Sequence, residues 1–446
     1  MKVLIVGKGG REHALVWKIA QSPKVSKIFC APGNAGIAQL ADCVKIEAED
    51  VSNLVHFAEE KKIDLTVVGP EKPLYFGRIV NRFEERGLRI FGPNATAASI
   101  EGSKIIAKRF MWRHNIPTAD FEIFGDNSFS KGGAKEAIQY AKANIPCVIK
   151  FSGLVGGKGV FPCVTEEQAL AAIDKIMVKR EFNGRDNIVI EEFLKGEELT
   201  FTVLTDGSAI IPLLSIQDHK RLLDGNEGPN TGGMGVYVPV PMVTRELERE
   251  IIETIIEPTL KGMRDEGWGY KGVLYVGLML TQDGPRVLEF NCRFGDPELQ
   301  PLVLLMENDI VPILMAITEG NLAKDYGILP EERFHWLDAA AVCVVMVSQG
   351  YGYVKDPEVG KEIKGLDIVS KMKDVVVFHA GTIKDGNTWK TAGGRVLGVT
   401  AKAKTLPEAI KLDYEAVSQL SWDGEHHRAH IAGKALQYGI QLRTRL

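Results

Sequence analysis

Two lysines in and beside a glycine-rich turn could hold phosphate. The stretch reads CVIKFSGLVGGKGV (147–160), with Lys150 in a short apolar run and Lys158 among the glycines. A Walker-type P-loop needs a serine or threonine after the lysine and then a helix. Here Gly159 follows the lysine, and VFPCV (160–164) has the composition of a strand. The pattern favours a flap between two strands that closes over nucleotide phosphates, and its alternative is a flexible turn with solvated lysines.

A second candidate site lies on the strand predicted within RVLEFNCRFGDPELQ (286–300). Side chains two residues apart share a strand face, so Glu289, Asn291 and Arg293 are predicted together, with Leu288 and the other apolar residues opposite. Carboxylate and amide oxygens are hard ligands for Mg²⁺, and a guanidinium can neutralise a phosphoryl group in transfer. This face is predicted to hold metal and triphosphate, unless it is an ordinary solvent face with a salt bridge.

A strand exit in VIEEFLKGEELTF (189–201) offers groups for a nucleoside. The strand ends at Glu191, Glu192 and Phe193, where backbone groups could meet an adenine edge and the aromatic ring its face. The carboxylate of Glu198 could accept both ribose hydroxyls. Acidic residues near a turn are more often simply solvated, so this segment alone is weak evidence.

A long polar loop rich in glycine follows the first predicted hairpin. Asp218 and Lys220 come directly after a strand end, and Asn230, Thr231 and Gly232 could present backbone donors to an anion. Such a loop is uncommon inside a compact domain unless it is functional. The alternative is a disordered surface loop.

The N-terminus, MKVLIVGKGG, is a predicted strand that enters a glycine turn and then a helix. A dinucleotide-binding G-x-G-x-x-G turn needs a glycine where Glu12 stands, and the next strand ends at Pro32 without an acidic residue. The sequence therefore disfavours a nicotinamide or flavin site. Backbone N–H groups at the helix start can still hold a phosphate, and the alternative is a tight turn before a helix.

The composition is that of a globular protein with several domains. A chain of 446 residues is too long for one core and suggests about three or four domains. The net charge of −4 does not indicate a nucleic-acid or membrane-surface binder. The six cysteines are scattered without metal-ligand spacing, which is typical of a reducing compartment. Without a signal-peptide pattern or an apolar run of membrane-spanning length, we expect a cytoplasmic protein.

Apolar runs alternate with helical patterns in the N-terminal part of the chain. Strand-like segments at 2–6, 27–31, 64–69 and 88–92 predict an open parallel α/β sheet. Ligands bind such sheets at the carboxyl ends of the strands.

The middle of the chain changes to hairpins. Turns are predicted at Asp206-Gly207 and Asp283-Gly284, and an amphipathic helix near 244–265. Asp296 is the expected cap of a helix that starts at the following proline. A smaller C-terminal α/β unit is expected after these elements.

A series of short motifs, in order along nearly the whole chain, resembles the ATP-grasp ligases and, among them, the phosphoribosylamine–glycine ligase family. The motifs are VGKGGREHAL, APGNAG, VVGPEKPL, FGP, EGSK, GLVGGKGV, IEEFLKGEE, QDHKR, GPNTGGMG, LEFNCRFGDPE, FHAGT and GGRVL. The resemblance implies an α/β protein with an N-terminal substrate-binding domain (1–102), a two-part ATP-grasp domain and a small C-terminal α/β domain (326–446). The implied ATP-grasp core covers 103–120 and 193–325, and its flap subdomain covers 121–192.

The resemblance also implies a reaction. ATP phosphorylates the carboxylate of glycine, and the amine of 5-phosphoribosylamine attacks the glycyl phosphate, giving glycinamide ribonucleotide, ADP and phosphate in purine biosynthesis. The metal would be Mg²⁺ or Mn²⁺, and the enzyme a monomer or weak homo-oligomer that binds neither nucleic acid nor membrane. No side-chain nucleophile is needed, because the protein aligns the reactants, neutralises charge and excludes water.

The resemblance also implies roles for the residues of this chain that match the family's motifs. The implied ATP ligands are Lys104, Lys150, Gly156, Gly157, Lys158, Glu191, Glu192, Phe193 and Glu198. The implied metal ligands are Glu289 and Asn291, and Arg293, Asp218 and Lys220 would lie near glycine and the acyl phosphate. The residues implied to face phosphoribosylamine are Gly9, Gly10, Arg11, Asn34, Glu71, Asn230, Thr231 and Gly232.

The chain departs from the family pattern in the flap, where Phe151, Ser152, Val155 and Gly157 replace smaller or acidic residues, and at Lys8, which adds positive charge. These changes leave the flap lysines intact. Three rival functions stay open: another ATP-grasp carboxylate–amine ligase of purine metabolism, a nucleotide sensor that binds ATP without turnover, and an oxidoreductase.

Overall fold

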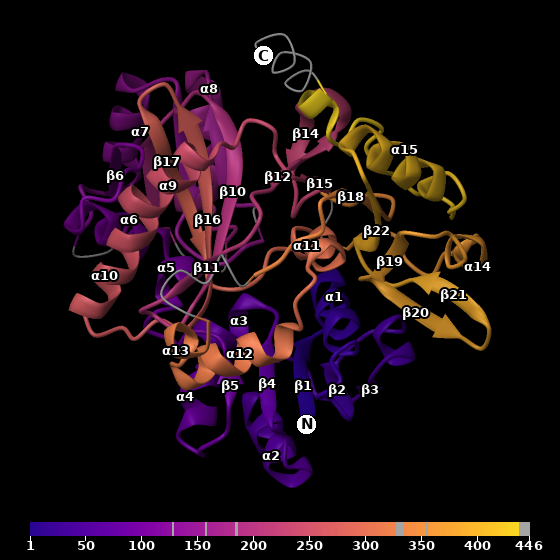
Figure 1. Ribbon diagram of the computed structural model, residues 1–446. Coiled ribbons are helices and arrows are strands. Elements are labelled where there is room, and N and C mark those ends of the chain that lie inside the picture. The colour runs from indigo at the N-terminus through magenta and orange to yellow at the C-terminus, as the bar shows by residue number, and fades with distance from the viewer. Residues whose placement is uncertain (127–128, 157, 183–185, 327–333, 354–355, 437–446) are drawn as a thin grey trace.

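The computed structural model describes residues 1–126, 129–156, 158–182, 186–326, 334–353 and 356–436. Within these residues, four sheets of four or five strands carry the architecture. Figure 1 shows the N-terminal unit at the bottom, the hairpin and flap sheets at the upper left, and the C-terminal unit at the right. The mixed α/β fold with a parallel N-terminal sheet is confirmed.

The N-terminal sheet is parallel, with strand order β3-β2-β1-β4-β5. Its strands are β1 (Lys2–Gly7), β2 (Lys27–Pro32), β3 (Asp42–Cys43), β4 (Leu65–Val68) and β5 (Ile90–Phe91), and its helices are α1 (Gly10–Ile19), α2 (Val51–Lys61), α3 (Glu71–Tyr75) and α4 (Ile79–Glu84). Helices α1 and α3 begin soon after the carboxyl ends of the adjacent strands β1 and β4. This edge therefore presents the glycine turn and Glu71 together.

The flap sheet has the order β6-β9-β7-β8 and is antiparallel. Its strands are β6 (Phe121–Phe124), β7 (Cys147–Phe151), β8 (Val160–Cys163) and β9 (Ile188–Glu192), with helices α7 (Ala134–Ala143) and α8 (Glu166–Ile173). The side chain of Thr165 accepts a hydrogen bond from the N–H of Gln168 and caps α8. The glycine-rich loop joins β7 to antiparallel β8, as predicted.

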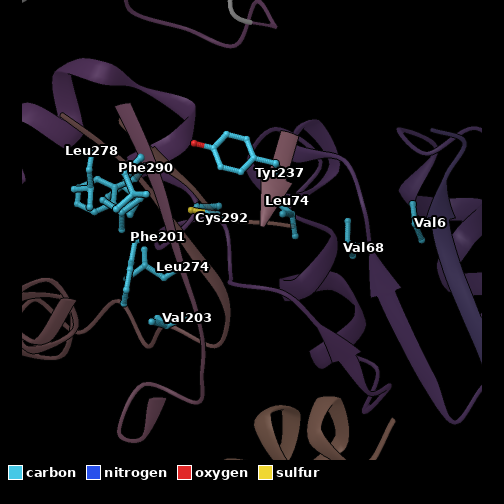
Figure 2. Close-up of a cluster of buried hydrophobic side chains, with 14 of the residues drawn as sticks. Val6, Val68, Leu74, Phe201, Val203, Tyr237, Leu274, Leu278, Phe290 and Cys292 are labelled. Atoms are coloured by element: carbon cyan, nitrogen blue, oxygen red, sulfur yellow. The ribbon is translucent and has the colours of Figure 1, made fainter. Parts of the chain in front are cut away.

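The hairpin sheet, with order β11-β10-β16-β17, carries the predicted metal face. Its strands are β10 (Glu197–Thr205), β11 (Ile210–Pro212), β16 (Gly272–Thr281) and β17 (Gly284–Asn291). Both predicted hairpins are antiparallel pairs. Figure 2 shows Phe201, Leu274, Leu278 and Phe290 clustered on this sheet, part of a core that also includes Val6 of the N-terminal sheet.

A bulge in β17 corrects one expectation. Gly277 is opposite Glu289 but Leu278 is opposite Val287, so Leu288 is an extra residue in the ladder. Leu288 was predicted to share the apolar face with Phe290, whereas in the structure it lines a small pocket with Lys220 and other polar residues. The extra residue reverses the alternation, and the buried Val287 takes the inward position instead.

The C-terminal sheet has the order β12-β15-β18-β22-β19. Its strands are β12 (Gln217–Asp218), β15 (Gly235–Val238), β18 (Ala340–Val347), β19 (Val375–His379) and β22 (Arg395–Ala403), and α15 (Leu406–Val417) packs against it. Strands β12 and β15 come from the segment predicted as ATP-grasp core, and β15 pairs with β18. The domain boundaries stay a prediction, but the pairing of β15 with β18 joins the predicted ATP-grasp core to the predicted C-terminal domain.

The remaining helices and ribbons join these sheets. They are α5 (Ser99–Gly102), α6 (Lys104–Arg113), α9 (Arg245–Ile251), α10 (Glu257–Asp265), α11 (Leu299–Leu305), α12 (Ile310–Glu319), α13 (Leu322–Tyr326), α14 (Leu366–Val369), β13 (Arg221–Leu223), β14 (Glu227–Asn230), β20 (Thr382–Asp385) and β21 (Thr388–Thr391). Helices α9 and α10, with a π-helical turn between them, form the predicted amphipathic helix. In the described part of the chain, no helix has the length and apolarity to cross a membrane.

The predicted helix start at Asp296 is wrong. Helix α11 begins at Leu299, and its cap residue is Glu298. The Asp296 carboxylate instead pairs with Arg395 at 3.1 Å and accepts a hydrogen bond from Gln300 Nε2 at 2.9 Å. Arg395 on the distant strand β22 thus pairs with Asp296, whose side chain was predicted from the local sequence to cap a helix.

Buried neutral histidines join the units. His13 Nδ1 on α1 accepts a hydrogen bond from the backbone N–H of His379 on β19 at 2.8 Å, so its ring is neutral. Burial lowers the pKa of His13 to about 3, with His379 adding to the effect, and lowers the pKa of His379 to about 4. Burial lowers the pKa of His219 to about 4 as well. These rings stay neutral at pH values where an exposed histidine is charged.

We expect stability to fall as the pH is lowered from about 6.5 to about 4. Over this window the unfolded chain takes up protons that the buried rings cannot, which costs up to about 1.4 kcal/mol per pH unit for each histidine. Urea unfolding at a series of pH values measures the slope. His13→Asn keeps an acceptor for the His379 N–H and should reduce the slope, whereas His56→Gln, at an exposed position, should leave it unchanged. Equal slopes in all three proteins would contradict the assignment.

Candidate active site

A buried carboxylate between two lysines lies at the base of the flap. Lys150 on β7 lies opposite Val189, one same-face position from Glu191 on β9. Its ammonium donates to Glu191 Oε2 at 2.8 Å and to the Leu288 carbonyl at 3.0 Å. Lys108 on α6 approaches the same oxygen at 3.0 Å. Burial alone would raise the pKa of Glu191, but the two lysines lower it, so this carboxylate is ionised.

Lys108 is a residue that the sequence analysis missed. It lies four positions after the predicted ATP ligand Lys104 in α6, so the two share a helix face one turn apart. The four-residue spacing from Lys104, on a helix with a buried face, could have identified Lys108 from the sequence. Burial lowers the pKa of Lys104 even though the nearby Glu289 opposes the shift.

Lys220 lies between the predicted ribose and metal ligands. Its ammonium is 3.0 Å from Glu198 Oε2 and 3.9 Å from Glu289 Oε1. Burial alone would lower the pKa of Lys220, but these carboxylates raise it well above its usual value. The structure therefore brings Lys220, Glu198 and Glu289 together, as the site hypothesis requires.

Glu289 and Asn291 are suitable oxygen donors for a hard divalent cation. Burial alone would raise the pKa of Glu289, but Lys220 and Lys104 lower it, so the carboxylate is ionised and ready to bind a cation. Gly277 lies opposite on β16 and adds no ligand. Within the described ranges, no group of three or more His, Cys, Asp and Glu side chains could hold a metal by itself. The two donors fit Mg²⁺ or Mn²⁺ if nucleotide oxygens and water fill the other positions.

Arg293 joins the metal face to the N-terminal unit. Its guanidinium is 3.0 Å from Asn291 Oδ1, 3.1 Å from Glu101 Oε1 and 3.7 Å from Glu71 Oε2. Burial raises the pKa of Glu101 to about 7 against the effect of Arg293. Burial alone would also raise the pKa of Glu71, but Arg293 and Arg11 lower it. One cation thus faces two carboxylates, of which Glu71 is firmly ionised.

Asp218 is a poorly compensated carboxyl group. Burial, followed by the charge of Glu298, raises its pKa to about 8, and its Oδ1 has no hydrogen-bond partner. Glu298 itself accepts a hydrogen bond from the Tyr275 hydroxyl at 3.0 Å. A buried oxygen without a partner is costly, and an amine or ammonium group of a ligand would satisfy it.

Arg11 and Asn34, which were predicted to face the second substrate, lie where the N-terminal unit meets the segment after β17 and strand β19. Arg11 Nε is 2.7 Å from Glu12 Oε1, and Arg11 Nη1 donates to the Phe294 carbonyl at 3.1 Å. Asn34 Nδ2 donates to the carbonyls of Lys8 and His379. These side chains support the glycine turn through Lys8 and through Glu12, whose Oε2 accepts from the Gly9 N–H. Lys8 itself is exposed and is 3.4 Å from Glu47.

The 231–233 loop is tied to Lys220. The Thr231 hydroxyl donates to the Lys220 carbonyl at 2.9 Å and accepts from the N–H of Gly233 at 3.1 Å. Asn230 ends strand β14, paired with Arg221.

Other predicted ligands are not brought into this network. Gly156 and the side chains of Lys158 and Glu192 are exposed, and Phe193 is half-buried. Gly157 lies outside the described residues. The flap side of the predicted ATP site therefore rests on the loop's position between β7 and β8, and not on contacts of these side chains.

Comparison with known proteins decides the family. The chain matches the phosphoribosylglycinamide synthetase N domain over residues 1–101, the ATP-grasp (A) domain over 102–299 and the C domain over 341–434. It is 46% identical to the phosphoribosylamine–glycine ligases of Chlorobaculum tepidum, over 98% of this chain and all of that protein, and of Escherichia coli, over 98% and 99%. The chain belongs to the phosphoribosylglycinamide synthetase family.

Solved structures agree with this family. The crystal structure of phosphoribosylamine–glycine ligase from Thermotoga maritima superposes with a TM-score of 0.80 at 32% identity, covering 97% of this chain and all of that one. The biotin carboxylase domain of Hydrogenobacter thermophilus 2-oxoglutarate carboxylase, solved with MgADP, shares the fold at a TM-score of 0.71 and 17% identity, covering 95% of this chain and 91% of that one.

The structure accounts for two flap residues that depart from the synthetase family pattern. Phe151 stacks on Phe182 with ring centroids 5.0 Å apart, inside the flap core. The Ser152 hydroxyl accepts from the N–H of Ile105 at 3.2 Å and lies 3.2 Å from the Ser103 hydroxyl. A short polar side chain thus holds the start of α6 against the base of the flap.

Arg395, on β22, is a second residue that the sequence analysis missed. It belongs to the GGRVL motif, and its guanidinium donates to the carbonyls of Gly232 and Asp296 and pairs with the Asp296 carboxylate. The C-terminal unit of the synthetase fold therefore supports the 231–233 loop directly. The arginine that follows two glycines in this motif could have been singled out from the sequence, but its partners could not, because they are distant in the chain.

Replacing Arg395 with Met should loosen the 231–233 loop. The change leaves Asp296 without its cation and should cost about 3 kcal/mol of unfolding free energy. Amide hydrogen exchange should increase across 230–235, and urea unfolding gives the stability. Lys390→Met breaks an exposed pair with Asp385 and should cost less than about 1 kcal/mol. Unchanged exchange in the loop would show that Arg395 does not support it.

Proposed function

We infer that this chain is an ATP-dependent ligase that joins glycine to 5-phosphoribosylamine in purine biosynthesis. The observation that carries the inference is full-length similarity to ligases of that name, at about 45% identity. The contacts of Lys150, Glu289 and Arg293 support it, because they lie among the residues that we assign to the nucleotide, the metal and the second substrate.

The reaction needs two displacements. A carboxylate oxygen of glycine attacks the γ-phosphorus of ATP, and ADP leaves. The amine of phosphoribosylamine then attacks the acyl carbon of glycyl phosphate, phosphate leaves, and the new amide nitrogen loses a proton. Both steps gather negative charge in one place, so the protein's task is alignment and neutralisation.

The nucleotide is assigned to the space between the flap and the hairpin sheet. We propose that Lys104 and Lys150 bind its phosphates, with the loop amides of 156–157 and Lys158 closing from the flap. The strand exit at Glu191, Glu192 and Phe193 would hold adenine, and Glu198 the ribose. Leu288, brought to this side by the bulge in β17, adds an apolar surface against the nucleoside.

The divalent cation, Mg²⁺ or Mn²⁺, is assigned to Glu289 and Asn291. These two residues would hold the cation, which would supply positive charge to the phosphoryl group in transfer. The ionised state of Glu289 supports this assignment. Arg293 and Lys220 lie on either side and would neutralise the glycine carboxylate and the acyl phosphate.

The amine substrates are assigned to the side that faces the N-terminal unit. Asp218, with its unpartnered Oδ1, would bind an amine. The turn at Gly9 and Gly10, supported by Arg11 and Asn34, would bind phosphoribosylamine together with the residues Glu71, Asn230, Thr231 and Gly232. Backbone N–H groups at the start of α1 suit its phosphate.

The enzyme is proposed to act as a monomer or weak homo-oligomer in the cytoplasm. All six cysteines are free thiols, and five of them are buried, which supports a reducing compartment.

One coupled assay tests the function. ADP release should require glycine, phosphoribosylamine and ATP together, and mass spectrometry should find glycinamide ribonucleotide. Release that ignores glycine would indicate another ATP-grasp ligase, and ATP binding without any product would indicate a sensor. A change in NAD(P)H absorbance would indicate an oxidoreductase.

Glu289→Gln should reduce kcat about 100-fold or more while the fold is kept, because the amide cannot supply the negative charge that holds the cation. The metal concentration needed for half-maximal activity should rise in the same variant. Glu84→Gln, at an exposed position on α4, serves as the control and should match the parent. A normal kcat at ordinary metal concentration would remove Glu289 from the site.

A further inference from the structure

We propose that Lys108 is a positioning residue that shares the Glu191 carboxylate with Lys150 and so leaves Lys150 free to attract the nucleotide phosphates. The proposal rests on the proposed function, since it assigns a role behind the ATP site. Lys108 itself would touch no substrate.

Hydrogen-bond capacity separates the two lysines. An ammonium group has three N–H donors. Lys108 Nζ has three protein acceptors, Thr118 Oγ1 at 2.8 Å, the Ala119 carbonyl at 3.2 Å and Glu191 Oε2 at 3.0 Å. Its side chain is 2% exposed. Lys108 therefore has no donor left for a ligand and no access to one.

Lys150 is different. Its ammonium has two protein acceptors in the described structure, Glu191 Oε2 and the Leu288 carbonyl. One N–H remains for a ligand. The Leu288 contact also places this ammonium beside the strand that carries Glu289, so the remaining donor lies close to the proposed metal-triphosphate site.

The charges of these groups also favour a supporting role for Lys108 and a phosphate-binding role for Lys150. Two ammonium groups meet one carboxylate oxygen, so the group of Lys108, Lys150 and Glu191 carries a net positive charge. Without Lys108, Lys150 and Glu191 would form a neutral pair and attract phosphate less strongly. Asp120 is a further charge near Lys108, and the Phe121 ring lies 5.3 Å from its ammonium. Neither is among the three hydrogen-bond acceptors of the Lys108 ammonium.

The cost of burying Lys108 also favours a functional role. Burial lowers its pKa to about 8 despite the neighbouring Glu191. A buried ion pair is generally no more stabilising than apolar residues of similar size. A second lysine on one carboxylate is therefore poorly explained by stability alone, whereas a net positive charge beneath a triphosphate site is useful.

The test compares nucleotides that differ in phosphate number. Calorimetric binding of adenosine and of ADP is measured for the full chain and for Lys108→Met. We expect the variant to bind ADP about tenfold more weakly and adenosine unchanged, because only phosphates sense the lost charge. Lys135→Met, which removes an exposed lysine on α7, should change neither affinity. An equal loss for both ligands, or no loss for ADP, would overturn the proposal.

A double variant provides the decisive comparison. Lys108→Met with Glu191→Gln removes one positive and one negative charge, so Lys150 regains its free charge and the ratio of ADP to adenosine affinity should return toward the parent value. A ratio as low as in Lys108→Met alone would overturn the proposal. Because the double variant has no Glu191 carboxylate that depends on Lys108, it also serves if the single variant does not fold. These measurements need neither glycine nor phosphoribosylamine, so their outcome is independent of the ligase assay.

Discussion

Buried charge where the sheets meet must be balanced by partners from other units, and the site depends on this constraint. Strand β17 and the residues after it bring Glu289 and Arg293 out of the hairpin sheet. Their partners are Lys220 from the loop before β13 and Glu71 from the N-terminal unit. A half-buried carboxylate or guanidinium left alone there would lose part of its solvation without an ionic partner to offset the loss. The units therefore fit together in the arrangement that pairs these charges.

At the positions assigned to bind ligands, some hydrogen-bonding and charged groups have no full set of protein partners. Asp218 has an unpartnered oxygen and a raised pKa, and Lys150 keeps a free N–H. By contrast, all three N–H donors of the supporting residue Lys108 have protein acceptors. The unused oxygen of Asp218 and the unused N–H of Lys150 are thus available to ligand groups. Substrates with amine, carboxylate and phosphate groups would supply the missing partners.

The C-terminal unit takes part in this arrangement. Strand β15 leaves the polar loop and joins the C-terminal sheet beside β18. Its Tyr237 packs in one hydrophobic core, while Val236 and Val238 pack in the other. Arg395 from β22 then holds the 231–233 loop from the far side. A loop that looks mobile from its glycine content is fixed at both ends by sheet pairing and by an arginine.

The sequence by itself determined the family, the parallel N-terminal sheet, both hairpins and the strand–loop–strand flap, and it predicts the ligand-binding residues. These follow from local periodicity and from motif order, which depend on neighbouring residues. It could not show the bulge at Leu288, the helix start at Leu299 or the roles of Lys108 and Arg395. Tertiary structure decided those, because each depends on a partner from a distant segment: the β16 ladder, Arg395 beside Asp296, Glu191 beside Lys108, and the Gly232 carbonyl.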